Sequence, residues 1–323
     1  MTVILQDSDA RQYMLPIDVS AATNIAHTPN PAPDPGVVAV ADWFQNVPGF
    51  SEKFGEALRQ SFDEVLDGQR TGRFDINDLE KTEKTYLGTK VEIVVRAAFD
   101  LSRGEKMDYS VAKHEVDSKF TVGTNWTIPG EAQGHICLLM MASDHTSSFR
   151  IGLLRIKDEY LNPGGNRDGK RSISKAGRAA VYWLVPNGKL PENILMSITE
   201  TDRNAIFDSG SGQARTNELF RRVQKRLVNR NTVVTVAKQE DSPKRVRDAR
   251  LHLRNEGIVI LGHQSTHRSI ARELGLPVPG RSYWVAARLT PIAPGSDRPS
   301  SSISGTHYAV AEPYESAVPA PAI

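Results

Sequence analysis

The sequence predicts a mixed α/β (α+β) fold divided into two units, on three observations. The first half contains two helical patterns followed by short strand-like runs. The second half contains several helices followed by a small hairpin. The chain of 323 residues is long enough for two domains, each with its own hydrophobic core.

Composition excludes several classes of protein. The hydrophobic content of 39% is typical of a globular chain rather than a collagen-like or wholly disordered one. The single cysteine, Cys137, excludes a disulfide framework and indicates a reducing compartment. The longest apolar run, Ile136 to Ala142, is far shorter than the roughly 20 residues of a membrane helix, and the N-terminus lacks a secretion signal. We therefore expect a cytoplasmic protein that binds no membrane.

The net charge of +2, from 40 basic and 38 acidic residues, conceals a strongly basic segment. Between Arg215 and Arg254 there are 12 Lys or Arg and 4 Asp or Glu, a net charge of +8, which leaves −6 on the other 283 residues. This distribution predicts a polyanionic partner for the second half.

Both ends of the chain differ from its middle. Residues 1–48 are predicted to form a proline-rich, partly disordered arm, because proline stands at every second position from Pro29 to Pro35 and favours extended geometry. Residues 291–323 are rich in Ser, Pro and Gly. They are predicted to form a loose tail with one edge strand near His307–Val310.

The middle of the chain is predicted to divide near residue 165. The stretch Asn162–Arg171 contains Pro163, Gly164 and Gly165, which are residues typical of a linker. The predicted domains are therefore residues 49–165 and residues 166–290.

The first of these domains is predicted to begin with two helices. Apolar residues three or four positions apart predict a helix that ends before Asp67-Gly68, and these residues are Phe54, Leu58, Phe62 and Val65. A second helix is expected after a cap at Asp75 or Asn77, and its core-facing residues are Leu79, Leu87, Val91, Val94, Val95 and Phe99. Four predicted strands follow, over Met107–Ala112, Val116–Val122, His135–Met141 and Arg150–Ile156.

The second domain is predicted to be mainly helical. Its helices are expected over about Ser174–Leu184, Ala214–Val228, Thr232–Gln239 and Pro243–Arg254. A cap at Asp241 or Ser242 begins the last helix, and Gly257 ends it. The strand Ile258–Leu261 is then expected to pair with Tyr283–Leu289. Three helices followed by a hairpin is the order of a winged helix-turn-helix.

The most informative short segment is Val116–Phe120, with the sequence VDSKF. Because side chains alternate along a strand, Asp117 and Lys119 project to the same face. A hairpin turning near Lys113–Glu115 would bring Asp108, nine residues before Asp117, to the same place. The resulting pattern is D-x8-D-x-K.

This pattern predicts metal-dependent hydrolysis of phosphodiesters. Asp108 and Asp117 can bind a hard cation such as Mg²⁺, which polarises the phosphate and acidifies a bound water, while Lys119 orients or deprotonates that water. Glu92 interrupts the apolar run Val91–Val95 and is a further candidate ligand, direct or through water, since an unpaired carboxylate there is costly. The alternative is that the Asp/Lys pair is an ordinary solvated feature of an edge strand.

Basic residues predict a DNA-binding surface in the second half. The last helix of the helical set would enter a major groove, where Arg and Lys read guanine or contact phosphates. Its basic residues are Lys244, Arg245, Arg247, Arg250 and Arg254. The preceding basic helix adds Arg221, Arg222, Lys225, Arg226 and Arg230. The alternative for each single side chain is a solvated helix face.

Longer segments resemble one known family over Val65 to Pro313. In the first half they are Asp67–Arg73, Lys81–Thr85, Val116–Phe120 and Gly134–Leu138. In the second half they are Gly212–Arg215, Asn217–Val223, Lys244–Arg247, Glu256–Ile258 and Leu274–Pro279. By these segments the chain resembles the NaeI family of type IIE restriction endonucleases.

The resemblance implies a PD-(D/E)xK endonuclease domain joined to a winged-helix domain of the catabolite-activator type. It places the family's catalytic residues on Glu92, Asp108, Asp117 and Lys119, although Met107 stands where that motif usually has proline. The predicted DNA contacts also include Arg70 and Arg73.

Further properties follow from the resemblance alone. The family implies Mg²⁺-dependent cleavage of double-stranded DNA by a homodimer, with GCCGGC as the default target. A second DNA site would be held by the C-terminal domains as an activator. A cognate DNA methyltransferase would complete a restriction-modification system.

Two alternatives stay open at this point. The first is a winged-helix regulator whose nuclease-like half does not cleave, and metal-dependent cleavage of a plasmid distinguishes it. The second is a nuclease for nicked, mismatched or branched DNA, which discrete fragments from unrelated plasmids would exclude.

Overall fold

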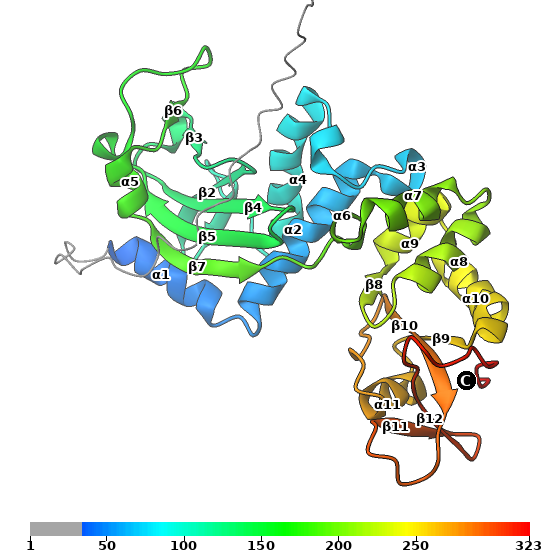
Figure 1. Cartoon of the computed structure of the whole chain (residues 1–323). Coiled ribbons are helices and arrows are strands. Elements are labelled where there is room, and N and C mark those ends of the chain that lie inside the picture. Colours follow the sequence, from blue (N-terminus) through cyan, green and yellow to red (C-terminus); the bar gives the residue numbers. More distant parts are fainter. Residues whose placement is uncertain (1–33) are drawn as a thin grey trace, which may run out of the picture.

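The computed structural model describes residues 34–323, so residues 1–33 of the predicted proline-rich arm lie outside the described residues. The described rest of the predicted arm is not an arm but a packed element: Pro35–Gln45 forms the helix α1, because apolar residues at helical spacing, such as Val40 and Phe44, are buried in the core. The part that is described shows a mixed α/β architecture with two main sheets (Figure 1), which confirms the predicted class. No helix among residues 34–323 is long and apolar enough to span a membrane.

The first sheet has five strands in the order β1-β2-β4-β5-β7. The strands are β1 (Tyr109–Val111), β2 (His114–Thr121), β4 (Ile136–Ser143), β5 (Ser148–Arg155) and β7 (Tyr182–Lys189). The β2/β4 pair is parallel and the other pairs are antiparallel. Seven of the eight residues of β4 are buried, as expected for a central strand that is covered on both faces.

Helices cover one face of this sheet. They are α1 (Pro35–Gln45), α2 (Phe50–Leu66) and α4 (Lys81–Phe99), and their apolar faces share one core with alternate residues of β4 such as Leu138 and Met140. The opposite face packs under α5 (Lys175–Ala179) and the ribbon of β3 (Thr127–Ile128) and β6 (Arg171–Ser172). The short α3 (Gly68–Thr71) and the single turns η2 (Ile76–Asp78), η3 (Gly130–Ala132) and η4 (Asp158–Tyr160) complete this unit.

The second half consists of a helical layer and a second sheet. The helices are α6 (Ile194–Ser197), α7 (Glu200–Asp208), α8 (Gly212–Arg222), α9 (Arg230–Ala237) and α10 (Ser242–Leu253), the last followed by η5 (Arg254–Glu256). Strand β10 (Tyr283–Pro291) pairs antiparallel with β8 (Leu227–Asn229), β9 (Ile258–Leu261) and β12 (Thr306–Val310). The helices α8 to α10 share a core with one face of β9, through Ile258 and Ile260. The other face packs on α11 (Ser265–Glu273) and β11 (Ser300–Ile303).

Most of the predicted elements are confirmed, including the helix that ends at Asp67, the four strands of the first half and the pairing of the strands in the second half. The helix expected from Ala214 to Val228 is shorter, since α8 ends at Arg222 and Lys225 has a positive φ of 61°. The tail is also more ordered than expected, because β11 and β12 pair with each other.

Two local predictions are wrong for identifiable reasons, and one further helix is unexpected. The helix over Ser174–Leu184 is only the five residues of α5, because the chain from Tyr182 pairs with β5 as β7, so tertiary pairing overrides a weak local helical pattern. Helix α4 begins one turn later than expected, because Glu80 and Glu83 form a capping box there, and Asp75 caps η2 instead. The helix α11 is unexpected, and it lies between β9 and β10 in the sequence.

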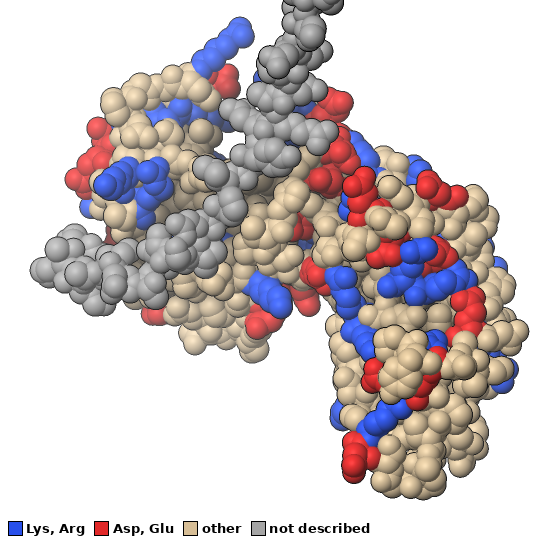
Figure 2. All heavy atoms as spheres, in the orientation of Figure 1, with Lys and Arg blue, Asp and Glu red and all other residues tan. Residues whose placement is uncertain are grey.

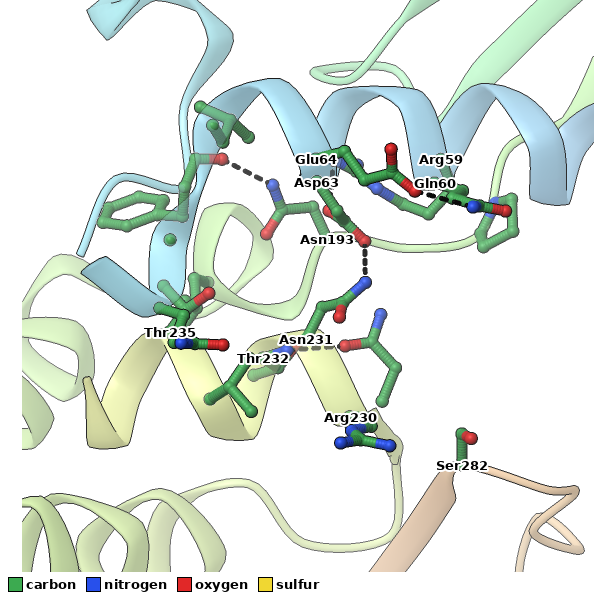
Figure 3. Close-up of a pocket in the computed structure, with 18 of the residues that line it drawn as sticks. Arg59, Gln60, Asp63, Glu64, Asn193, Arg230, Asn231, Thr232, Thr235 and Ser282 are labelled. Carbon is green, nitrogen blue, oxygen red and sulfur yellow. Dashed lines mark hydrogen bonds and ion pairs between the residues drawn. The ribbon is translucent and has the colours of Figure 1, made fainter. Parts of the chain in front are cut away.

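A polar interface joins the two units. Asp63 of α2 accepts a hydrogen bond from Asn231 of α9 (2.6 Å), and α3 approaches α9 so closely that a Cβ at Gly68 would lie 2.2 Å from Oγ1 of Thr235. An open cavity of about 710 Å³ lies at this interface and is lined by residues of both units (Figure 3). In the wall of this cavity the guanidinium of Arg59 is ion-paired to Asp63 (2.8 Å), which also lines the cavity, and to the buried Asp144 (2.6 Å).

Candidate active site

A tight hairpin brings the two predicted aspartates together. Tyr109 pairs with Val116, so Asp108 and Asp117 are the next residues in register at the open end of the hairpin. The turn is made by Ala112 and Lys113, both with positive φ (50° and 66°). The predicted hairpin is therefore confirmed.

A second set of contacts fixes the strand that leads into Asp108. The carboxylate of Glu115 accepts hydrogen bonds from the backbone N–H groups of Glu105, Lys106 and Met107 (2.8–3.0 Å). These bonds hold the pKa of Glu115 below its usual value. Asp108 itself accepts a hydrogen bond from the backbone N–H of Ser118 (2.6 Å), so both ends of the hairpin are held by carboxylates.

Asp117 and Lys119 lie on the same face of β2, as their alternation predicts. The Nζ atom of Lys119 is 2.6 Å from Oδ2 of Asp117 and donates to the carbonyl of Ser118 (3.1 Å). Asp117 is only 6% exposed. Burial raises the pKa of its carboxyl group, and the charge of Lys119 opposes that rise.

Glu92 reaches this site from α4. The hydroxyl of the buried Tyr109 donates to the backbone carbonyl of Glu92 (2.9 Å), which ties the helix to the hairpin. Burial and the negative charge of Asp108 raise the pKa of Glu92, and Arg96 is its nearest cation at 3.7 Å. Glu92, Asp108 and Asp117 thus lie in one region, with Lys119 of β2 beside Asp117.

The donor set fits a hard cation. Carboxylate and backbone oxygens are the ligands that Mg²⁺ prefers. Burial first, and then the negative charge of Asp108, raise the pKa values of Glu92 and Asp117, and a bound cation would oppose both effects. Among residues 34–323, however, no three acidic, His or Cys side chains lie close enough to hold one ion together. The arrangement therefore offers two carboxylates to one cation, and water would complete the coordination shell.

A cleft opens beside these residues. Its volume is about 550 Å³, and Glu92, Asp108, Ser118 and Lys119 line it. Other polar residues of its walls carry no sequence signal for this site, and they are Asn77, Lys84, Asn125, Glu131 and Lys170. The sequence around Lys170 indicates only a glycine-rich linker.

A cysteine also contacts the candidate site. Cys137 is the register partner of Asp117 on β4, and its Sγ donates to Oδ2 of Asp117 (3.5 Å). Burial raises the pKa of the Cys137 thiol well above its usual value, so the group is a protonated donor. Its sequence context indicates only a buried apolar strand.

Replacing this thiol should weaken the support of Asp117. We expect Cys137→Ala to lower kcat by about two- to tenfold, which is the range set by the loss of one hydrogen bond. Cys137→Ser keeps a donor and should recover much of the loss. Steady-state kinetics of both variants and the wild type measures the effect, and equal behaviour of the Ala and Ser variants would contradict the role of the donor.

The predicted DNA-contact residues of α10 divide into two groups. Lys244, Arg247 and Arg254 are exposed and lie along one face with Leu251, which is 71% exposed. Arg247 has no ion pair or hydrogen bond within the described part of the chain, whereas Lys244 pairs with Asp248 (2.8 Å).

Two other arginines of that helix, Arg245 and Arg250, are half-buried and point inward. Arg245 donates to Gln213 of α8 (3.4 Å), and Arg250 donates to the carbonyl of Ile260 (2.8 Å). Burial lowers the pKa of Arg250. Arg254 is exposed, but its Nε donates to the carbonyl of Ala320 (3.1 Å). The structure therefore leaves Arg247 as the least engaged cation of α10.

The second predicted basic surface is largely engaged in ion pairs. Acidic and basic side chains intermingle over this part of the molecule (Figure 2). The pairs are Arg221 with Glu218 and Glu256, Arg222 with Glu218 and Asp202, and Arg226 with Glu192. Lys225 is exposed. In the first half, Arg73 is bidentate to Glu83 (2.8 and 2.9 Å), while Arg70 is 76% exposed beside Asp67.

A cleft with carboxylates and a lysine in one unit, and an exposed basic helix in the other, are features of a DNA-cleaving enzyme. Comparison with known proteins agrees: the family model of restriction endonuclease NaeI matches residues 39–319.

The chain therefore belongs to the NaeI restriction endonuclease family. It is 45% identical over 277 residues to the type II restriction enzyme NaeI of Lentzea aerocolonigenes, an alignment that covers 82% of this chain and 87% of that enzyme. The family resemblance and the prediction of a type II site-specific deoxyribonuclease are confirmed.

Proposed function

We propose that this protein hydrolyses double-stranded DNA in a Mg²⁺-dependent, sequence-specific reaction carried out by Asp108, Asp117 and Lys119, with Glu92 in support. The observation that carries the proposal is the hairpin geometry. It holds Lys119 Nζ 2.6 Å from Asp117 with Asp108 beside it, at the wall of an open cleft.

The roles follow from the chemistry of the side chains. Asp108 and Asp117 would hold the cation, and Glu92 would reach it through water, since the three carboxylates do not cluster closely enough to share one ion. Bound Mg²⁺ polarises the scissile phosphate and acidifies water. The ammonium of Lys119 lies where it can orient the attacking water and balance the negative charge that develops on the phosphate.

We also assign the finer fold of each unit. The first unit would be a PD-(D/E)xK core. The second would be a winged helix, in the order α8, β8, α9, α10, β9 and β10, with α10 as the recognition helix. The boundary between them belongs near residue 190 rather than 165, because β7 pairs with β5 of the first sheet.

The relation to NaeI supports further parts of the proposal. The protein would act as a homodimer on GCCGGC, with a second DNA site held by the C-terminal units as an activator. It would act in the cytoplasm, paired with a methyltransferase that protects the host DNA. A dimer with two-fold symmetry matches a palindromic target.

One digestion tests the core of this proposal. Genome-sized DNA is incubated with Mg²⁺, with and without EDTA, and the fragment ends are sequenced. We expect cutting only without EDTA, at one short palindrome. Absence of cleavage would favour the regulator, and cutting confined to nicked or branched DNA would favour the structure-specific nuclease. Comparing one-site with two-site substrates then tests activation.

The exposed face of α10 yields a separate prediction. Arg247→Ala should weaken binding of duplex DNA by about 1–3 kcal/mol, because an unpaired exposed arginine on a recognition helix is free to contact a guanine edge or a phosphate. The matched control is Arg268→Ala, an exposed arginine of α11 on the opposite side of the second sheet. Binding is measured in EDTA over a salt series. Equal losses for both variants would contradict the assignment of α10.

A further inference from the structure

The loop between η4 and β6 is a built structure rather than a linker. Oδ1 of Asn166 accepts hydrogen bonds from the backbone N–H groups of Asp168 (3.0 Å) and Lys170 (2.9 Å). Two backbone bonds also join its ends: Asn166 N–H donates to the carbonyl of Lys170, and Gly169 N–H donates to that of Asn166, each at 2.9 Å. The loop Asn162–Lys170 therefore has a preformed tip.

The base of the loop is anchored by the next residue. Arg171 donates to the carbonyls of Asn162 (2.8 Å) and Leu161 (3.3 Å) and is ion-paired to Asp158 (2.6 Å). Three basic residues lie in this region: Arg167, Lys170 and Arg171. Arg171 is engaged in the contacts that hold the loop to the rest of the first unit.

The other two cations of the loop are available. Residues 163–170 are all exposed, and within the described part of the chain Arg167 and Lys170 make no side-chain hydrogen bond or ion pair. The loop stands away from the sheet (Figure 1), and basic atoms extend from its outer end (Figure 2). Lys170 also lines the cleft that contains Glu92, Asp108 and Lys119.

Three carboxylates and three lysines line the cleft. The carboxylates are Glu92, Asp108 and Glu131, and the lysines are Lys84, Lys119 and Lys170. Without Lys170 the carboxylates outnumber the lysines, and such a lining disfavours a DNA backbone, which bears one negative charge per phosphate. Because the loop is preformed, its backbone loses little entropy when Lys170 and Arg167 bind phosphate, and only their side chains must be ordered.

We propose that the loop Asn162–Lys170 clamps the phosphate backbone of the DNA in the cleavage cleft, with Lys170 contacting a phosphate inside the cleft and Arg167 one outside it. The inference rests on the proposed function, because it assigns this cleft to the DNA strand that is cut. The contacts are to phosphate and carry no base sequence.

Two variants and a control test the clamp. Lys170→Ala and Arg167→Ala should each raise KM about three- to tenfold with little change in kcat, and each should reduce the slope of log(kcat/KM) against log[salt] by about 1. The matched control is Lys175→Ala, an exposed lysine of α5 that does not line the cleft. Thermal unfolding midpoints should match the wild type.

A binding measurement separates this proposal from the function on which it rests. The double variant and the wild type are titrated with a short duplex in EDTA over a salt series, and the double variant should show a slope smaller by about 2. If binding falls in this way but the wild type never cleaves, the clamp stands and the proposed function fails. If the wild type cleaves and the variants keep its KM and salt slopes, the clamp is wrong. New cutting sites in either variant would also overturn it, since they would show base reading.

Discussion

Asp117→Ala and Lys119→Ala should each abolish DNA cleavage in Mg²⁺. We expect kcat to fall by about 10³-fold or more, because in the proposed mechanism each change removes a group that acts on the metal, the water or the developing charge. Asp117 and Lys119 are 2.6 Å apart on one strand face, so the loss of either also leaves the other without its partner.

The measurement is single-turnover cleavage of a duplex that carries the target site. Sequence-specific binding in EDTA should stay measurable in both variants, since α10 lies in the other unit. Lys106→Ala is a matched control, because this exposed lysine contributes only its backbone N–H to the hairpin. Full cutting by either active-site variant would show that the hydrolytic residues lie elsewhere.

The second large effect concerns stability. Arg59→Ala should lower the free energy of unfolding by about 3–5 kcal/mol, because it leaves Asp63 and the fully buried side chain of Asp144 without their cation. The midpoint of unfolding in urea should fall, while the slope of the free energy of unfolding against urea concentration should stay unchanged.

Two comparisons make the test specific. Asn231→Ala removes only the hydrogen bond to Asp63 and should cost about 1 kcal/mol. Asp144→Asn in the Arg59→Ala background removes one of the uncompensated charges, so the double variant should be more stable than Arg59→Ala alone. If Arg59→Ala lowers the free energy of unfolding by less than about 1 kcal/mol, the carboxyl groups of Asp63 and Asp144 are hydrated or protonated in the variant and the prediction is wrong.

The first unit shows what local patterns can predict. The alternation of Asp117 and Lys119 and the turn near Lys113 were readable from spacing, because strand alternation and a short hairpin are local properties. The capping box that begins α4 at Glu80 and Glu83 is also local in sequence, but the predicted caps, Asp75 or Asn77, lie before it. The short α5 was overpredicted because the pairing of β7 with β5 is set by distant residues.

The candidate interface shows what local patterns cannot predict. Whether an arginine is free depends on acids far along the chain: Glu256 is 35 residues from Arg221, and Asp202 is 20 residues from Arg222. The same holds for the thiol of Cys137, which meets Asp117 across two parallel strands 20 residues apart. Basic composition thus predicts a polyanionic partner, while only the fold distinguishes an available cation from one already paired.

The hairpin of the candidate active site also has a consequence for the order of folding. The bonds that shape it, from Glu115 to the backbone of residues 105–107 and from Ser118 to Asp108, span only 8 to 10 residues. Short loops are closed at small entropic cost and within microseconds, whereas the contact between Asp63 and Asn231 must close 168 residues. We therefore expect this hairpin to form early on the nascent chain, before the second unit packs against α2.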